Sequence, residues 1–238
     1  MVWLIVTSGI ALLILLAAFV RSSACIAHSW YVKAFCERKD CKDKLVVLSY
    51  DDGLNGEMTD RIAEVLKRHG AKASFFVIGS KLAGREEQLR RLIGEGHCIG
   101  NHSYSHDYRN EFRFSRKHIS EIELCNEAVY RACGLRPRFY RPPIGVTTPH
   151  LGKAARLCGM EVIGWSVRSF DTVSRLSRER VVARIMRKIR PGGIILMHDR
   201  CPDADRLTEM LLYALEKKGY RTVTLEELSG LEAYGEKR

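Results

Sequence analysis

The sequence lacks several patterns by which common protein classes are recognised. No low-complexity stretch interrupts its 238 residues, of which 46% are hydrophobic and 28% charged, as in a chain with a folded core. Neither GxGxxG nor GxxxxGK[ST] follows the first predicted strand, which argues against the common nucleotide-binding α/β folds. The net charge is +11, but the basic residues form no dense run with interleaved aromatic residues, so we expect no nucleic-acid partner. An anionic membrane surface or an acidic polymer remains compatible with this charge.

The cysteines also lack a recognisable pattern. They form no CxxC pair and no regular disulfide framework, which favours reduced thiols, although Cys36 and Cys41 are close enough in sequence to pair. The eight positions are Cys25, Cys36, Cys41, Cys98, Cys125, Cys133, Cys158 and Cys201.

The N-terminus is the longest hydrophobic run in the chain. Residues 2–20 are apolar except for Thr7, Ser8 and Gly9, and Arg21 follows directly. This is about the length that crosses a ~30 Å hydrocarbon core. No basic residue precedes the run, which is longer than the roughly 7–15 residues of a signal peptide, so we predict a retained single-pass anchor. The small residues at 22–24 keep a cleaved signal peptide open as the alternative.

We expect four parts along the chain: a transmembrane anchor at 1–21, a membrane-proximal linker at 22–43, a globular domain at 44–230 and a tail at 231–238. Apolar runs predict strands at 45–48, 73–78, 97–100, 139–141, 161–165, 194–197 and 220–223. Helical patterns lie between them, for example at 56–69, 115–133, 178–189 and 204–218. Helix-ending glycines precede five of the strands, and Thr224 with Glu227 predicts a capping box. This alternation predicts a parallel sheet covered by helices, either a barrel or an open doubly wound sheet.

In both architectures, chemistry takes place at the carboxyl ends of the strands. Asp51 and Asp52 follow the first strand; they would point in different directions, one toward a metal and the other free as a base. His102 and His106 follow the third strand and can converge on one ion if that segment makes a helical turn. Taken singly, these are also the residues of an ordinary turn and of exposed loop histidines. Taken together, they form a two-histidine, one-carboxylate set that suits Zn²⁺ or another divalent first-row metal.

Further polar residues follow the later strands. Arg141 begins an Arg-Pro-Pro-Ile-Gly segment, in which the prolines fix the backbone and the guanidinium can pair with a neighbouring carboxylate. Trp165 and Asp171 come after the fifth strand. His198 ends the sixth strand, where an imidazole can donate a proton near neutral pH. A structural role for each of these residues is the simpler interpretation when they are taken one at a time.

The order of these segments resembles the NodB-type polysaccharide deacetylases, carbohydrate esterase family four. The motifs of that family run [ST]FDDG, H[ST]xxH, RxPxG, a Trp/Asp segment and LxH. Here they read SYDDG, HSYSH, RPPIG, WSVRSFD and LMH, all in order, and the resemblance spans about residues 44–228. It implies a distorted (β/α) barrel of seven or eight strands. It also implies a hydrolase that removes N-acetyl groups from amino sugars of a polysaccharide or glycoconjugate.

The resemblance also implies roles for individual residues. Asp51 would be the general base and His198 the general acid. Asp52, His102 and His106 would hold a divalent metal, Zn²⁺ first, with Co²⁺ or Ni²⁺ as alternatives. The other implied assignments are Arg141 orienting Asp51, Asp171 tuning His198, Trp165 and Leu196 walling the acyl pocket, and Tyr50 and Ile144 as further substrate contacts.

Two residues depart from the family pattern. Tyr50 replaces a phenylalanine and adds only a hydroxyl. Ile144 replaces an aromatic residue; its backbone N–H, implicated in the oxyanion hole, survives the change, but contacts with the sugar ring would differ. The sequence therefore constrains the type of reaction more closely than it constrains the substrate.

Three alternatives stay open: a deacylase of a lipid-linked sugar or another amide, a non-haem iron oxygenase that shares the ligand set, and a silent carbohydrate-binding module. The basic residues that follow the apolar run predict a cytoplasmic domain, whereas a polysaccharide substrate favours the opposite side of the membrane. No small-xxx-small pattern in the anchor points to an oligomeric state.

Overall fold

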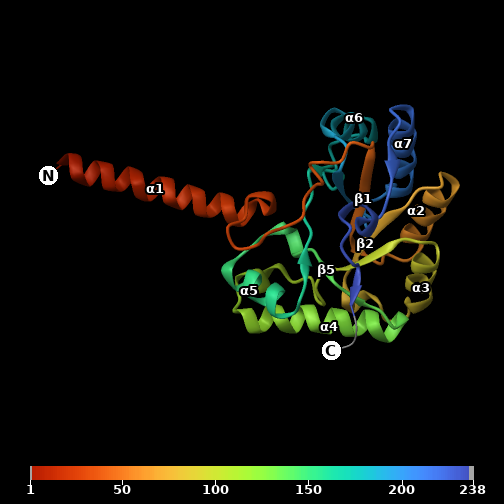
Figure 1. Cartoon of the computed structure of the whole chain (residues 1–238), viewed down its shortest axis with the longest axis horizontal. Coiled ribbons are helices and arrows are strands. Elements are labelled where there is room, and N and C mark those ends of the chain that lie inside the picture. Colours follow the sequence, from red (N-terminus) through yellow and green to blue (C-terminus); the bar gives the residue numbers. More distant parts are fainter. Residues whose placement is uncertain (1, 236–238) are drawn as a thin grey trace.

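The computed structural model of the chain describes residues 2–235 and consists of one projecting helix and an α/β domain (Figure 1). The projecting helix is α1 (Val2–Ala24), and a short 3₁₀ turn, η1 (Ile26–His28), follows it. Within α1, Thr7–Ala24 is long and apolar enough to cross a membrane, a property that an N-terminal signal sequence shares. The helix stands away from the domain over most of its length, as its exposed apolar side chains indicate.

The domain is built on a curled parallel sheet of eight strands. Seven of them follow the order β6-β5-β3-β2-β1-β8-β7, and β9 pairs with the start of β1. Their bounds are β1 Leu45–Gly53, β2 Ala73–Val77, β3 Cys98–Asn101, β5 Phe139–Tyr140, β6 Glu161–Val162, β7 Val167–Arg168, β8 Gly193–His198 and β9 Arg221–Thr222. The predicted distorted barrel is confirmed as a half-barrel whose ends are β6 and β7. The strands β4 (Arg136–Pro137) and β10 (Tyr234–Gly235) form a separate antiparallel pair.

Helices cover the outside of this sheet. They are α2 Glu57–Arg68, α3 Glu86–Gly94, α4 Ser115–Cys133, α5 Pro149–Leu157, α6 Arg178–Lys188, α7 Ala204–Lys217 and α8 Leu225–Ser229. Three further 3₁₀ turns, η2 Gly79–Lys81, η3 Tyr108–Phe112 and η4 Pro143–Gly145, lie in the connections that follow β2, β3 and β5. These connections leave the carboxyl ends of the strands, where the predicted site residues also lie.

Local signals in the sequence account for the ends of several helices. Gly134 ends α4 with a φ of 78°, a left-handed conformation that glycine adopts without steric cost. The other predicted glycines, Gly70, Gly96, Gly159 and Gly219, also have positive φ. The Thr224 side chain accepts a hydrogen bond from the Glu227 N–H at the start of α8. The predicted helix ends are therefore confirmed at these positions.

The segment between α1 and β1 packs on the domain. Phe35 and Glu37 form isolated bridges to Ile163 and Gly193, and so connect the β6 end of the sheet to β8. Ile26 is buried in an apolar cluster that includes residues of α4 and α5. The predicted linker thus contributes to the core and closes part of the half-barrel.

Candidate active site

Asp51 and Asp52 lie at the carboxyl end of β1, at an irregularity in the strand. The register against β2 shifts between Tyr50 and Gly53, and Asp52 has a φ of 71°. Adjacent residues of a regular strand point to opposite faces, but a bulge with a left-handed residue redirects one of them. Both carboxylates consequently approach the same imidazole: His102 Nε2 lies 3.7 Å from Asp51 Oδ2 and 3.5 Å from Asp52 Oδ1. The predicted divergence of the two side chains is therefore wrong.

A polar network that we did not predict holds the backbone of Asp52. The Asp52 carbonyl accepts hydrogen bonds from Asn55 Nδ2 at 2.9 Å and from Lys81 Nζ at 2.8 Å. Asn55 also donates to Asp199, which accepts a second hydrogen bond from the Thr59 hydroxyl at 2.6 Å. Burial raises the pKa of Asp199 to about 6, although its hydrogen bonds with Thr59 and Asn55 oppose this shift. These contacts stabilise the left-handed backbone conformation of Asp52, which directs its side chain toward the histidines.

His102 and His106 converge through a bend and not through the helical turn we considered. Ser103 and His106 both have positive φ, and the Ser103 hydroxyl accepts a hydrogen bond from the His106 N–H at 3.0 Å. His102 Nδ1 lies 2.8 Å from the Arg141 carbonyl oxygen, so Nδ1 carries the proton and Nε2 is free to bind a metal. The two imidazole rings lie 4.8 Å apart between centroids.

The donor atoms of Asp52, His102 and His106 fit a metal ion. They lie within 4.8 Å of one another, and Asp52 Oδ1 is 3.5 Å and 3.2 Å from the two Nε2 atoms. Zinc–ligand bonds of about 2.0–2.1 Å in a tetrahedron separate ligand atoms by roughly 3.4 Å. The spacing of the carboxylate oxygen from both imidazoles therefore agrees with what a small divalent metal requires.

The pKa shifts of these ligands favour the protonation states that a metal needs. Burial opposes ionisation of Asp52, but its hydrogen bonds with His102 and Arg200, and the positive charge of either histidine whenever it is protonated, hold its pKa well below the usual range. Burial, together with the neighbouring imidazole of His102, lowers the pKa of His106. An ionised carboxylate and a neutral imidazole are the forms that bind a cation.

Arg141 is completely buried behind Asp51. Its Nη1 donates to Asp51 Oδ1 at 2.7 Å and to the Ser49 hydroxyl at 2.9 Å, and its Nη2 donates to the Gly164 carbonyl at 2.9 Å. The guanidinium also lies 4.0 Å from the centre of the Phe76 ring. Arg141 therefore contacts a single oxygen of Asp51, and the other oxygen faces His102.

His198 and Asp171 form a second pair beside these carboxylates. Asp171 accepts hydrogen bonds from His198 Nδ1 at 2.9 Å and from the His198 backbone N–H at 2.7 Å. Burial works to lower the pKa of His198, but the hydrogen bond and the charge of Asp171 raise it above its ordinary value. His198 and Asp51 are direct partners in the β1–β8 register, so the imidazole lies across from the proposed base.

Arg200 was not among the predicted site residues. Its Nε donates to Asp52 Oδ2, the oxygen that does not face the histidines. The signal for it was the position of a cation two residues beyond His198, in the loop after β8. Arg200 can hold the Asp52 carboxylate while Oδ1 stays directed at the ligand cluster.

The four predicted substrate-contact residues occupy different environments. Trp165 packs on Gly145, where an added Cβ would lie 2.3 Å from the indole ring. Ile144 is exposed and has a φ of 51°, which is rare for a β-branched residue. Leu196 is buried on the same face of β8 as His198.

Tyr50 does not join the cluster. It is fully buried, stacks on Phe75 and hydrogen-bonds through its hydroxyl to Thr208 of α7 at 2.8 Å. As the residue before Asp51, it points to the opposite face of β1, toward the helices. Its position suits a core residue and not the predicted contact with substrate.

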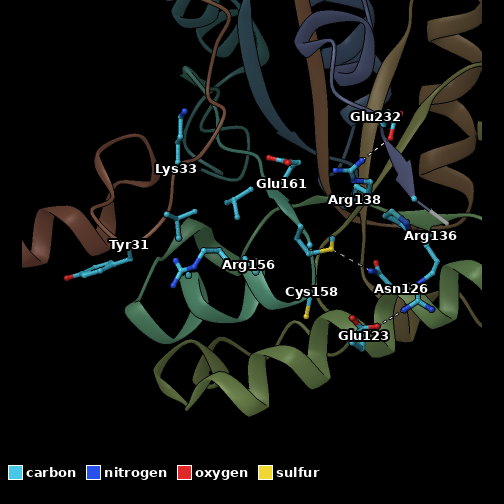
Figure 2. Close-up of a pocket in the computed structure, with 18 residues that line it drawn as sticks. Tyr31, Lys33, Glu123, Asn126, Arg136, Arg138, Arg156, Cys158, Glu161 and Glu232 are labelled. Carbon is cyan, nitrogen blue, oxygen red and sulfur yellow. Dashed lines mark hydrogen bonds and ion pairs between the residues drawn. The ribbon is translucent and has the colours of Figure 1, made fainter. Parts of the chain in front are cut away.

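A cavity of about 900 Å³ lies elsewhere, between α4, α5 and the β4 strand (Figure 2). Two of its arginines are paired, Arg136 with Glu123 and Arg138 with Glu232. None of the predicted site residues lines it. The candidate site is therefore the cluster at the carboxyl ends of the strands.

Several known proteins are similar to this chain in sequence. A sequence profile described as polysaccharide deacetylase matches residues 38–163. A chitooligosaccharide deacetylase of Bradyrhizobium sp. (strain ANU 289) is 30% identical over 217 residues, which cover 83% of this chain and 98% of that protein. The peptidoglycan-N-acetylglucosamine deacetylase PgdA of Listeria monocytogenes serotype 1/2a (strain 10403S) is 31% identical over 82% of this chain, which spans only 40% of PgdA.

A solved structure is similar over the same region. The crystal structure of the Bc1960 peptidoglycan N-acetylglucosamine deacetylase, in complex with a naphthalenyl N-oxidanyl-benzamide, has a TM-score of 0.76 and 28% sequence identity. The match covers 84% of this chain and 94% of that chain.

Proposed function

The chain belongs to the polysaccharide deacetylase family, and on this premise we propose that it removes N-acetyl groups from amino sugars with a divalent metal. The observation that carries the proposal is the convergence of Asp52 Oδ1 with the two imidazoles, 3.5 Å from His102 and 3.2 Å from His106, beside a second carboxylate. An iron oxygenase could share the three ligands, but it has no use for the Asp51–Arg141 and His198–Asp171 pairs. A silent binding module would need neither the ligands nor these pairs.

Asp52, His102 and His106 would hold the metal, Zn²⁺ in our proposal, with Co²⁺ or Ni²⁺ as alternatives. A bound divalent metal supplies Lewis-acid polarisation of the acyl carbonyl and of the attacking water. Arg200 and the His102 Nδ1 contact would orient the ligands, as hydrogen bonds behind metal ligands usually do.

Asp51 would act as the general base that takes a proton from the attacking water. Its free oxygen faces His102, and Arg141 fixes the other oxygen from behind. A buried carboxylate with one guanidinium partner keeps its orientation while it accepts a proton. The backbone N–H of Ile144 would donate to the oxyanion of the tetrahedral intermediate; the left-handed conformation of Ile144 supports this role, because such outliers concentrate at functional sites.

His198 would be the general acid that protonates the amine as the carbon–nitrogen bond breaks. Asp171 holds Nδ1, so the proton to be donated is on Nε2. Burial works to lower the pKa of His198, but the hydrogen bond and charge of Asp171 raise it above its ordinary value, which favours the protonated imidazole that a general acid requires. Trp165 and Leu196 would form the wall against which the acetyl methyl group packs.

The test uses the full chain, purified, stripped of metal and reloaded with Zn²⁺ or Co²⁺. Acetate release would be followed from chitooligosaccharides and from peptidoglycan fragments, with His102→Ala as the control. We expect metal-dependent release that the control loses. Metal binding without acetate from any glycan would turn the search to other amides, and failure to bind metal would overturn the proposal.

A further inference from the structure

The C-terminal turn of α1 is held by the domain and is not a free tether. Ser22 is only 1% exposed. Thr147 donates from its backbone N–H to the Ser23 carbonyl at 2.9 Å and from its hydroxyl to the Ser22 carbonyl at 3.0 Å. The Ser22 hydroxyl accepts a further hydrogen bond from the Trp30 N–H at 2.7 Å. Cleavage after residue 24 would remove these contacts from the folded domain.

The contacts that follow extend the same attachment. Ile26 is buried against the cluster that contains Tyr140 and Leu151. The Tyr31 carbonyl packs so closely on Gly152 of α5 that an added Cβ would lie 2.3 Å from it. Figure 2 shows Tyr31 near α5 and Lys33 farther along the same segment, and both residues line the cavity described above. The segment between α1 and β1 is therefore packed on the domain, and it does not act as a flexible linker between the domain and the end of α1.

The point of attachment lies next to the candidate active site. Thr147 follows η4, the turn that contains Ile144 and packs beside Trp165. Three residues of extended chain reach at most about 10 Å, so Ile144 lies within that distance of Thr147. The 23 residues of α1 make a helix about 34 Å long, enough to cross a ~30 Å hydrocarbon core and leave Ser22 among the lipid headgroups.

The exposed side chains near this attachment suit a bilayer surface. Trp30 is 66% exposed, Ile144 56% and Phe114 77%, and the Phe114 ring contacts His150 at the start of α5. Tryptophan prefers the membrane–water interface, and two cations beside Phe114, Arg113 and Arg116, suit anionic headgroups, whereas Lys117 pairs with Glu121 at 2.8 Å. Figure 1 shows α1 joining the domain on the side that carries α5.

We propose that the substrate is an N-acetylated amino sugar carried by a membrane lipid, presented to the site at the bilayer surface. This inference rests on the proposed deacetylase function and specifies its substrate class. Because the domain is hydrogen-bonded to the end of α1 at the level of the lipid headgroups, its site stays close to the bilayer and away from glycans that lie farther out. The same attachment gives a lipid-linked sugar, which diffuses in the same bilayer, a high effective concentration at the site.

The test uses the full chain in phospholipid vesicles. One substrate is N-acetylglucosamine joined through pyrophosphate to a polyprenol in the same vesicles, and the other is chitotetraose in the surrounding water. In the test variant, a flexible Gly/Ser spacer of about 12 residues between Arg21 and Ser22 lets the intact domain move roughly 20 Å away from the end of the anchor and reorient relative to the bilayer. The control variant carries the same spacer before Val2, where it leaves the distance between Ser22 and the membrane unchanged.

We expect acetate release from the lipid-linked sugar to exceed that from chitotetraose by about tenfold or more in kcat/KM. The spacer after Arg21 should remove this preference and leave chitotetraose hydrolysis unchanged, and the control spacer should change neither. Equal or faster hydrolysis of chitotetraose by the unaltered chain, or a spacer variant that keeps the preference, would overturn the substrate class alone. No acetate from either substrate or from peptidoglycan fragments would overturn the proposed function as well.

Discussion

Asp51 and Arg141 form an ion pair in which the guanidinium has no exposed surface and the Nη1–Oδ1 distance is 2.7 Å. The arginine is held by two backbone carbonyls and lies over the Phe76 ring, so its position is set by the core. The other Asp51 oxygen faces the ligand cluster. The pair thus joins the hydrophobic core to the proposed base. Substituting Arg141 tests its contribution to the stability of the fold, and substituting Asp51 tests its contribution to the rate.

Asp51→Asn should leave metal bound and remove most of the turnover, because the amide keeps the shape of the carboxylate but cannot accept the proton. General bases contribute about 10²–10⁴-fold, which sets the expected loss in kcat. Acetate release and metal content would be measured on the same preparation. Asp52→Asn is the matched control and should lose the metal; a rate like that of the unaltered chain in Asp51→Asn would remove Asp51 as the base.

Arg141→Met should destabilise the fold by about 3–5 kcal/mol, because it leaves the Asp51 charge buried without its partner. The free energy of unfolding from urea titration measures this loss. Adding Asp51→Asn in the same chain should restore part of it, since no buried charge then remains. The exposed pair of Arg131 with Glu127 provides the control, and Arg131→Ala should change little. A stability of Arg141→Met equal to that of the control would contradict the prediction.

Asp171→Asn should shift the alkaline limb of the pH–rate profile to lower pH. His198 must be protonated to act as the acid, so the rate falls as the pH rises through its pKa. Burial works to lower that pKa, while the hydrogen bond and charge of Asp171 raise it above the ordinary value. Without the carboxylate charge the pKa drops, and the limb moves with it; an unchanged limb would show that another group is the acid.

Metal loading should stabilise the fold. A ligand at about 100 times its Kd adds about 2.7 kcal/mol to the free energy of unfolding, which calorimetry would detect as a higher Tm. Chelation should reverse the gain. His102→Ala and His106→Ala should each remove most of it, whereas His150→Ala, outside the cluster, should keep it. Stabilisation that survives both ligand substitutions would place the metal elsewhere.

Tyr50→Phe distinguishes a core residue from a substrate contact. The change removes the hydrogen bond to Thr208 and should cost about 1 kcal/mol of stability. The values of kcat and KM should stay as in the unaltered chain, because the hydroxyl points away from the cluster. A raised KM with unchanged stability would return Tyr50 to the substrate site.

Much of the architecture could be read from short-range patterns. Apolar runs, helix-ending glycines and the Thr224 cap depend on residues close together in the chain, so they persist in the fold. The rule that parallel strands meet at their carboxyl ends groups Asp52, His102, His106 and His198 from the sequence alone. The family motifs agreed with that grouping because they follow those strands.

Other features depend on the tertiary structure. The bulge at Asp52 is held by the nearby Asn55 and also by Lys81, which lies 29 residues away and is brought to it by the fold. Arg200 reaches Asp52 across 148 residues of sequence, which only the β1–β8 pairing brings together.

The sequence by itself determined the family, the alternation of strands and helices, and the set of polar residues at the strand ends, because these follow from local chemistry and spacing. Only the tertiary structure decided which of those side chains face one another, and that the end of α1 is docked beside the third motif on Thr147. Such contacts join segments more than 100 residues apart. Their geometry is fixed by the curl of the sheet and by the segment before β1, which packs between the two ends of the sheet.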